Sequence, residues 1–519
     1  MKKITLLFWI MFFPLLSCAQ DLVSAWPVNA GPLNPHLYSP NQMYAQVLVY
    51  EGLVRYDKDN KIEPAIAESW QISNDGKTYT FTLKEGQLFS DGSTLDAFAV
   101  EKNFKAIMLN KMRHSWLGIV NKIESFKALD STHFELKLNS PYVATLQELS
   151  LPRPFRILAP SGFKTDDTSK GIAKPIGSGA WQLAETRLGE YDIFIPNPHF
   201  KGQKPAFKRL VVKVLPDPNA RVLALQSGAV DILTGKDSLS LENFVRLQKD
   251  GRYITEKSDI QGTTMLVINA SSERLTKDIA IRKAILHAFN KDNVISGILL
   301  NTEQKADNLF SPTLPYADQK LQPYTYNKEL AQQFLEDADW KLNGKTRQKE
   351  SKKLELDLIY IGTNPIQKAI AEALQGDLSK VGITLNLIAN EEVSFYQTQK
   401  NGKFDLIFNE TWGNPYDPHS FLGSMLTSSH ADYTAQKDLP NKAEIDKSIQ
   451  NILDSNAADS EILQKKYHFV LNALNDSAIY LPISYSFIPA VYHKDRIKDF
   501  QFGAMQTEFM FHLFTPAKP

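Results

Sequence analysis

Side chains able to bind a ligand gather in one stretch of the chain, between Thr411 and His430. The stretch contains Trp412, Tyr416, His419 and His430, together with two prolines and two glycines. Aromatic faces and imidazoles on a backbone stiffened by proline suit the wall of a binding site. A surface loop that leads into a short helix is the plainer interpretation, and the stretch alone does not decide between the two.

No catalytic motif accompanies this stretch. The chain lacks a His-Glu-x-x-His zinc helix, a Gly-x-x-x-x-Gly-Lys-Ser/Thr phosphate loop and a Gly-x-Ser-x-Gly nucleophile turn. A secreted metallohydrolase is the remaining enzyme hypothesis, and it would depend on His419 and His430. Two imidazoles eleven residues apart fall short of the three or four ligands that a zinc site needs. We therefore expect a binding protein and not an enzyme.

Two arginine-containing segments and one methionine add candidates. Arg113-His114-Ser115-Trp116 sets an arginine and a tryptophan three residues apart, on one face if the segment is helical. Arg153 lies between two prolines, where a guanidinium can hold a carboxylate through two parallel hydrogen bonds. Met43 falls in the first turn of a helix predicted over 41–50. A single arginine is more often a solvated charge in a loop, and a methionine more often fills the hydrophobic core.

The composition excludes some classes of partner. Lys+Arg and Asp+Glu are equal at 58 each, so the formal net charge is 0. A general binder of nucleic acid or of anionic membranes would carry a basic surplus. The hydrophobic fraction of 43% and the charged fraction of 22% are those of an ordinary globular protein. A chain of 519 residues exceeds what one core supports, so we expect two or three lobes.

The N-terminus is typical of a secretory signal over residues 1–19. Two lysines precede an almost wholly apolar run, Ile4 to Leu16, which is too short to span a bilayer. Cys18 is the only cysteine, so no internal disulfide can form. Leu15-Leu16-Ser17-Cys18 resembles a lipobox, which would anchor the protein to a membrane through Cys18, whereas cleavage just after Ala19 would release it. Both outcomes place the mature protein outside the cytoplasm.

Strands and helices alternate in the second half of the chain. A strand over 354–360, a helix over 365–380 and a strand over 383–388 form a βαβ unit, which implies a parallel pair of strands. The next strand, over 404–408, ends just before Thr411. Ligands of α/β sheets bind at the carboxyl ends of strands, so this position favours the binding interpretation.

The chain is expected to leave its first lobe and to return to it. We predict lobe I over residues 20–265 and 487–519, with an inserted subdomain over roughly 58–185, and lobe II over 266–486. Two connections between lobes are typical of a hinged clamp that closes on a ligand.

Four segments in a fixed order carry a family resemblance. They are Ala67-Glu68-Ser69-Trp70, Asp75-Gly76-Lys77-Thr78-Tyr79-Thr80-Phe81, Pro175-Ile176-Gly177-Ser178-Gly179 and Ser227-Gly228-Ala229-Val230-Asp231-Ile232. These segments resemble the family 5 extracytoplasmic solute-binding proteins, which serve ABC importers of peptides and nickel. The resemblance implies an α/β, two-lobed, hinged periplasmic-binding-protein fold of type II, in the three-subdomain class C. It also implies a periplasmic monomer whose partners are the membrane permease subunits of an ABC importer.

Further segments resemble the nickel-binding members of that family. They include Arg113-His114-Ser115-Trp116, Leu151-Pro152-Arg153-Pro154-Phe155-Arg156, Tyr416-Asp417-Pro418-His419 and Ser429-His430-Ala431-Asp432. The resemblance implies that His430 ligates nickel, which arrives as a small chelate and is transported, with no permanently bound cofactor. Arg113 and Arg153 would meet the carboxylates of a chelator such as free L-histidine.

The same resemblance implies which side chains line the pocket. They are Met43, Trp116, Tyr396, Trp412, Tyr416 and Thr507. His419 then becomes a structural residue. Nickel prefers nitrogen and oxygen donors, and one protein imidazole leaves coordination positions for the chelator.

A di- or oligopeptide receptor, or a haem receptor, is the alternative within the family. Peptide binders of this family usually carry a carboxylate three residues after the position that Trp412 matches. Pro415 stands there in this chain and Asp417 is displaced, which counts against peptides. On local context alone, His430 would be interpreted as a solvated histidine in a polar loop.

Overall fold

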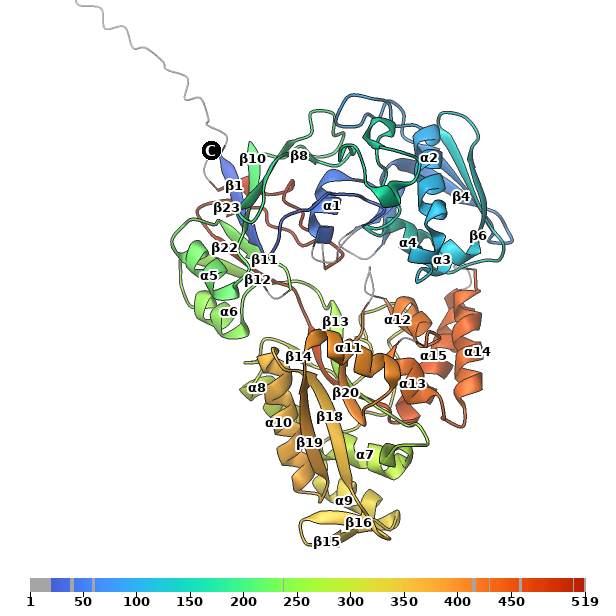
Figure 1. Ribbon diagram of the computed structural model, residues 1–519, viewed down its shortest axis with the longest axis vertical. Coiled ribbons are helices and arrows are strands. Elements are labelled where there is room, and N and C mark those ends of the chain that lie inside the picture. The colour runs from blue at the N-terminus through green and yellow to red at the C-terminus, as the bar shows by residue number, and fades with distance from the viewer. Residues whose placement is uncertain are drawn as a thin grey trace, which may run out of the picture.

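The computed structural model describes most of the chain. The described residues are 20–37, 42–57, 61–236, 238–412, 417–428, 430–456, 460–506 and 508–517. They form two lobes, each built on its own large β-sheet, at the two ends of an elongated molecule (Figure 1). Within these ranges, no helix combines the length and apolar character that crossing a membrane requires.

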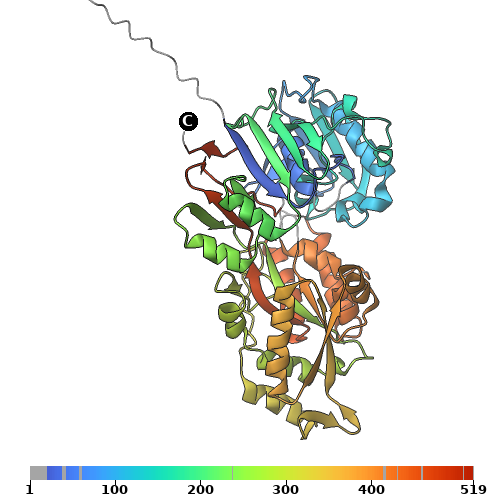
Figure 2. The same ribbon diagram turned by 60° about the vertical axis from the view of Figure 1, so that its left-hand side comes forward.

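Lobe I is built on a seven-stranded mixed sheet. Its order is β12 (Tyr253–Lys257), β22 (Pro489–His493), β11 (Ile232–Thr234), β1 (Asp21–Trp26), β10 (Arg209–Val214), β9 (Tyr191–Pro196) and β8 (Trp181–Arg187). β1 lies parallel to both of its neighbours, β10 and β11. β22 comes from the C-terminal part of the chain and lies between β11 and β12. The chain therefore returns to the lobe in which it begins (Figure 2).

A smaller antiparallel sheet belongs to the same lobe. Its order is β4 (Ala67–Ile72), β5 (Thr78–Leu83), β7 (His133–Leu138) and β6 (Ile123–Ala128), and α2 (Ala97–Leu109) packs on β6 and β7. A tight turn joins β4 to β5, and Gly76 adopts a φ of +68° there, which a side chain would disfavour. The other elements of lobe I include α1 (Met43–Val49), β2 (Val54–Tyr56), β3 (Ile62–Pro64), α3 (Gly118–Lys122), α4 (Thr145–Ser150), α5 (Pro218–Gln226), α6 (Leu241–Gln248), β23 (Ile497–Lys498) and β24 (Thr515–Pro516).

Lobe II is built on a six-stranded sheet. Its order is β14 (Gln304–Lys305), β21 (Tyr480–Ser486), β13 (Gly262–Ile268), β20 (Leu406–Glu410), β18 (Glu355–Ile361) and β19 (Thr384–Asn390). β18 and β19 are parallel and are joined by α10 (Pro365–Ser379), which confirms the predicted βαβ unit. Asn364 begins that helix because its side chain accepts hydrogen bonds from the backbone N–H groups of Ile366 and Gln367.

Helices surround this sheet. They are α7 (Ile279–Ala288), α8 (Lys291–Gly297), α9 (Lys328–Asp337), α11 (Glu392–Asn401), α12 (Pro418–Ser424), α13 (Ala431–Gln436), α14 (Lys442–Leu453) and α15 (Ser460–Asp476). A three-stranded sheet of β15 (Lys341–Asn343), β16 (Thr346–Lys349) and β17 (Lys352–Lys353) lies at the far end of the lobe (Figure 1).

Sheet membership differs from the predicted domain limits at two strands. β13 pairs along its whole length within the sheet of lobe II, although its first residues precede the predicted limit after residue 265. β8 pairs with β9 in the seven-stranded sheet, although it begins before the predicted end of the insertion at 185. A division drawn by sheets therefore falls before Gly262 and before Trp181.

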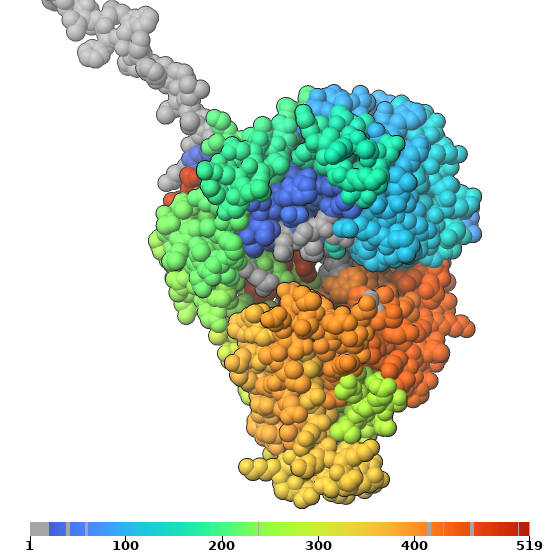
Figure 3. All heavy atoms as spheres, in the orientation of Figure 1, coloured from blue at the N-terminus to red at the C-terminus, as the bar shows by residue number. Residues whose placement is uncertain are grey.

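Among the described residues, contacts between the lobes lie on either side of a hollow (Figure 3). The hinge contact lies beside the chain crossings and joins Lys236 and Lys257 of lobe I to Glu410 and Thr302 of lobe II. The outer contact lies under α3 and α4 and joins Lys122, Val143 and Glu148 to Asp454, Leu453 and His419. The hollow between the two contacts is where a ligand held by both lobes would lie.

Candidate functional site

Two predicted arginines and a tryptophan come together on lobe I. Arg113 lies on a 3-10 helix, Lys111–His114, and its side chain is exposed. The guanidinium of Arg153 lies 4.8 Å from the centroid of the Trp116 ring, in a cation–π contact. Burial first, and then the charges of Arg113 and Arg153, lower the pKa of His114 to about 4. Both arginines are thus close to the same neutral imidazole and form a cationic corner suited to carboxylates.

An aromatic wall on lobe II carries the predicted metal ligand. Trp412 follows β20, and its ring stacks on the imidazole of His430 with centroids 5.9 Å apart and planes at 26°. Phe421 of α12 meets Trp412 edge-on at 6.3 Å. Burial lowers the pKa of His430, whose side chain is half-buried. The imidazole is therefore neutral at neutral pH, the form in which its nitrogen can bind a metal.

A buried carboxyl group fixes the helix that begins after His430. Asp432, in the first turn of α13, accepts hydrogen bonds from the Tyr480 hydroxyl at 2.7 Å and from Nδ2 of Asn409 at 3.1 Å. Burial raises the pKa of Asp432 to about 6. Since Asn409 belongs to β20, these bonds hold α13 against the strand that leads to Trp412.

The other predicted lining residues lie in different places. Met43 is buried as the first residue of α1. Tyr396 is 55% exposed on α11, close enough to Lys236 and Glu410 of the hinge contact for their charges to affect its pKa, which burial raises. Tyr416 and Thr507 lie outside the described residues, as do Pro415 and Cys18.

His419 lies away from the wall, in the outer contact. It is buried, and its Nδ1 pairs with the carboxylate of Asp417. Burial lowers its pKa, but Asp417 and then Glu148 outweigh burial, so the pKa of His419 lies above its usual value. Within the described residues, no group of three or more His, Cys, Asp or Glu side chains is placed to hold a metal ion.

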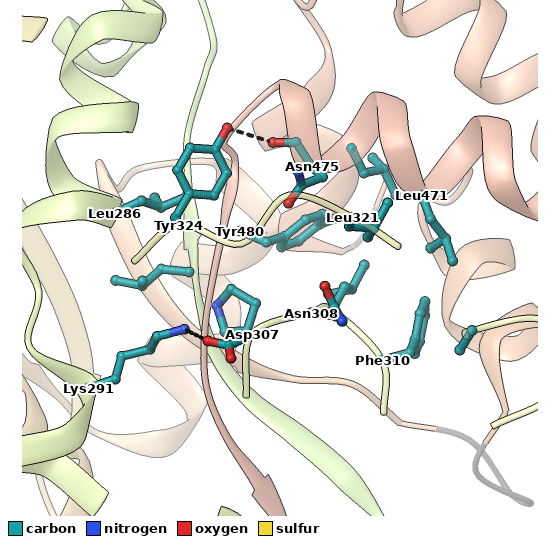
Figure 4. Close-up of a pocket in the computed structure, with 15 residues that line it drawn as sticks. Leu286, Lys291, Asp307, Asn308, Phe310, Leu321, Tyr324, Leu471, Asn475 and Tyr480 are labelled. Carbon is teal, nitrogen blue, oxygen red and sulfur yellow. Dashed lines mark hydrogen bonds and ion pairs between the residues drawn. The ribbon is translucent and has the colours of Figure 1, made fainter. Parts of the chain in front are cut away.

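The enclosed pocket in Figure 4 lies inside lobe II and not between the lobes. Its walls include Leu286, Phe310, Leu321, Tyr324, Leu471 and Tyr480. Two interactions join polar groups of its lining: Lys291 pairs with Asp307 at 2.8 Å, and the Tyr324 hydroxyl donates to the carbonyl of Asn475 at 3.0 Å. None of the predicted site residues lines this pocket, which is therefore separate from the candidate site.

Sequence reasoning missed two groups at the site. Asp432 stood in a segment of interest, but nothing local indicated that Tyr480, 48 positions away, would meet it. Lys236 and Glu410 form an ion pair across the lobes, and neither carries a motif. For Glu410, the only indication in the sequence was a charged residue close to the end of the strand predicted over 404–408.

Comparisons with known proteins agree with this geometry. Residues 61–433 match the family model described as bacterial extracellular solute-binding proteins, family 5 Middle. The chain is 43% identical to the nickel-binding periplasmic protein of Escherichia coli K12 over 98% of both chains. It is 25% identical to a probable D,D-dipeptide-binding periplasmic protein of the same organism, over 90% of this chain and 88% of that one.

A solved structure extends the comparison to three dimensions. NikA from Brucella suis, in complex with Fe(III)-EDTA, is 46% identical and superimposes with a TM-score of 0.92, covering 96% of this chain and 99% of that one. The family model spans well over half of the chain, and both lobes have their counterparts in NikA. This chain therefore belongs to the family 5 bacterial extracellular solute-binding proteins.

Proposed function

We propose that this protein captures nickel as a small-molecule chelate between its lobes and delivers it to an ABC importer. The observation that carries the proposal is the neutral imidazole of His430 stacked on Trp412 on one lobe, with the cationic corner of Arg113 and Arg153 on the other. A relative 43% identical is named a nickel-binding periplasmic protein, and a structural relative holds a metal–EDTA complex.

The two walls have complementary chemistry. His430 supplies one nitrogen donor, and nickel accepts nitrogen and oxygen donors in its remaining positions. A chelator that carries carboxylates fills those positions and presents negative charge to Arg113 and Arg153. Trp116 and Trp412 cover the chelate with aromatic faces and exclude water. Nickel is the cargo, so it leaves with the ligand when the lobes open.

Met43, Tyr396, Tyr416 and Thr507 complete the proposed lining. Met43 supplies an apolar side chain from α1, and Tyr396 supplies a ring from α11 beside the hinge contact. The proposed ligand set has no catalytic residue, in keeping with a transport receptor. We place the mature protein in the periplasm as a monomer, either free or anchored through Cys18, where it meets the permease subunits.

Isothermal titration of the mature protein tests this function. Nickel alone, nickel with free L-histidine and a mixed dipeptide pool are titrated separately. We expect strong binding only when nickel and a chelator are both present. Binding of dipeptides alone would replace the nickel proposal with a peptide receptor, the alternative that the dipeptide-binding relative represents.

A histidine variant tests the metal ligand itself. His430→Ala removes the proposed nitrogen donor and should weaken nickel-chelate binding about 100-fold or more, since second-shell changes alone cost 10–100-fold at metal sites. His468→Ala is the matched control, because His468 is an exposed histidine on α15. Equal affinities for the two variants would show that His430 does not ligate the metal.

A further inference from the structure

The buried side chain of Arg156 joins several segments that surround the candidate site. We propose that Arg156 is a positioning residue, which holds the turn carrying Arg153 so that the Arg153 guanidinium can meet a chelator carboxylate. This inference rests on the proposed function and deepens it, because it assigns a role to a side chain outside the proposed lining.

The Arg156 guanidinium closes the turn on both sides of Arg153. Its Nε donates to the carbonyl of Leu151 at 3.0 Å, and its Nη2 donates to the carbonyl of Ser150 at 3.0 Å. Both carbonyls precede Arg153 in the chain and Arg156 follows it. The side chain of Arg156 is only 4% exposed, so water does not compete for these bonds.

The same guanidinium ties the turn to two other parts of lobe I. Nη1 lies 3.4 Å from the carbonyl of Tyr50, the C-terminal cap of α1, and that helix carries Met43. Nη2 lies 3.8 Å from a carboxylate oxygen of buried Glu508. One cation thus fixes the turn against α1 and against the C-terminal segment.

Only a guanidinium fits this position. Its planar fork directs donors to several acceptors at once, whereas the single ammonium of lysine cannot reach all of them. A substituted residue must keep the positive charge at position 156. Burial raises the pKa of both Glu51 and Glu508, and the charge of Arg156 opposes that rise. Removing the cation would take from these buried carboxyl groups a counter-charge that Arg55 and Lys84 supply only in part. Lysine is therefore the informative substitution, since it keeps the charge and loses the fork.

The two site arginines differ in their dependence on Arg156. Arg153 is half-buried over Trp116 and lies within the turn that Arg156 holds. Arg113 lies on the 3-10 helix Lys111–His114, to which Arg156 makes no bond among the described residues. A change at Arg156 should therefore affect the carboxylate contact of Arg153 and spare that of Arg113.

A double-mutant cycle, measured by titration with nickel and L-histidine, tests this coupling. Arg156→Lys should weaken binding about tenfold in the wild-type and Arg113→Ala backgrounds. In the Arg153→Ala background, Arg156→Lys should change the affinity less than about twofold, because the contact that Arg156 positions is already absent. Equal losses with and without Arg153 would overturn the proposal and make Arg156 a general structural residue.

A matched arginine controls for loss of stability. Arg221 on α5 is also buried, and its guanidinium donates to the carbonyls of Ser238, Leu215 and Pro216 at 2.9, 2.7 and 2.9 Å. Arg221→Lys should lower the melting temperature and leave the affinity unchanged. If wild-type protein binds no nickel chelate at all, the proposed function fails, and that result is distinct from a cycle without coupling.

Discussion

The outer contact and the hinge contact join the same two lobes with different kinds of side chain. At the outer contact, Glu148 and His419 are both buried. At the hinge contact, the side chains of Lys236 and Glu410 are 48% and 29% exposed. Glu148 and His419 are thus withdrawn from water, whereas the Lys236–Glu410 pair stays in reach of solvent, as does Asp454 of the outer contact, whose side chain is 40% exposed.

The buried carboxyl group of the outer contact makes its hydrogen bonds within lobe I. Glu148 accepts hydrogen bonds from the backbone N–H groups of Gly118 and Ile119, at 3.2 and 2.9 Å, and from the Tyr142 hydroxyl at 2.6 Å. All three donors belong to lobe I, as Glu148 does, and Glu148 interacts with lobe II through the charge of His419. An exposed ion pair tolerates small shifts because water replaces its partner cheaply. The outer contact therefore includes a buried carboxyl group held by bonds within lobe I, whereas the hinge contact relies on an ion pair in reach of solvent.

The largest expected effect is at the outer contact. Glu148→Ala leaves three donors without an acceptor, which should lower the free energy of unfolding by about 2–4 kcal/mol. Urea denaturation followed by circular dichroism measures this loss. Glu124→Ala is the control, because Glu124 on β6 forms an exposed pair with Lys137 and should give no measurable change. Equal results for the two variants would show that buried Glu148 contributes no more to stability than an exposed pair does.

A carboxyl group near the hinge contact should make stability depend on pH. Burial raises the pKa of Glu303 from 4.5 to about 7, and the Ser484 hydroxyl, which donates to it at 2.5 Å, opposes that rise. The folded state thus binds a proton that the unfolded state releases above about pH 4.5. Glu303 therefore contributes a loss of stability as pH rises from 4.5 to about 7.

Glu303→Gln isolates that contribution. The wild type should lose free energy of unfolding between pH 5 and 8, and the neutral amide should remove up to about 2 kcal/mol of that loss. Urea denaturation at each pH measures it. Its carbonyl oxygen can still accept the hydrogen bond from Ser484. Identical pH profiles for the variant and the wild type would show that Glu303 is ionised like an exposed glutamate.

Local patterns predicted the parts of the site that depend on nearby residues. The strand before Trp412 and the parallel pair β18 and β19 follow from alternating hydrophobic runs and a capped helix. Features of this kind are determined by residues that lie close together in the sequence. Arg113 and Trp116 were expected on one face if their segment were helical, but the 3-10 helix ends at His114, before Trp116.

Contacts between distant segments could not be predicted in this way. The stacking of Trp412 on His430 depends on how α12 and α13 pack, and the support of Asp432 by Tyr480 depends on the order of strands. The hydrophobic pattern of β13 does not tell which sheet the strand joins. The predicted limit at residue 265 therefore fell inside β13.

The smallest effect should come from the ion pair of the hinge contact. Lys236→Met removes the charge that Glu410 meets, but Ser486 still donates to Glu410 at 3.0 Å. An exposed pair contributes about 0.2–1 kcal/mol, and salt screens it, so the loss should shrink between low and high salt. Lys341→Met, at the exposed pair with Glu336 in lobe II, is the control and should behave similarly. A loss as large as that of Glu148→Ala, unchanged by salt, would mean that the Lys236–Glu410 pair stabilises the protein as strongly as buried Glu148 does.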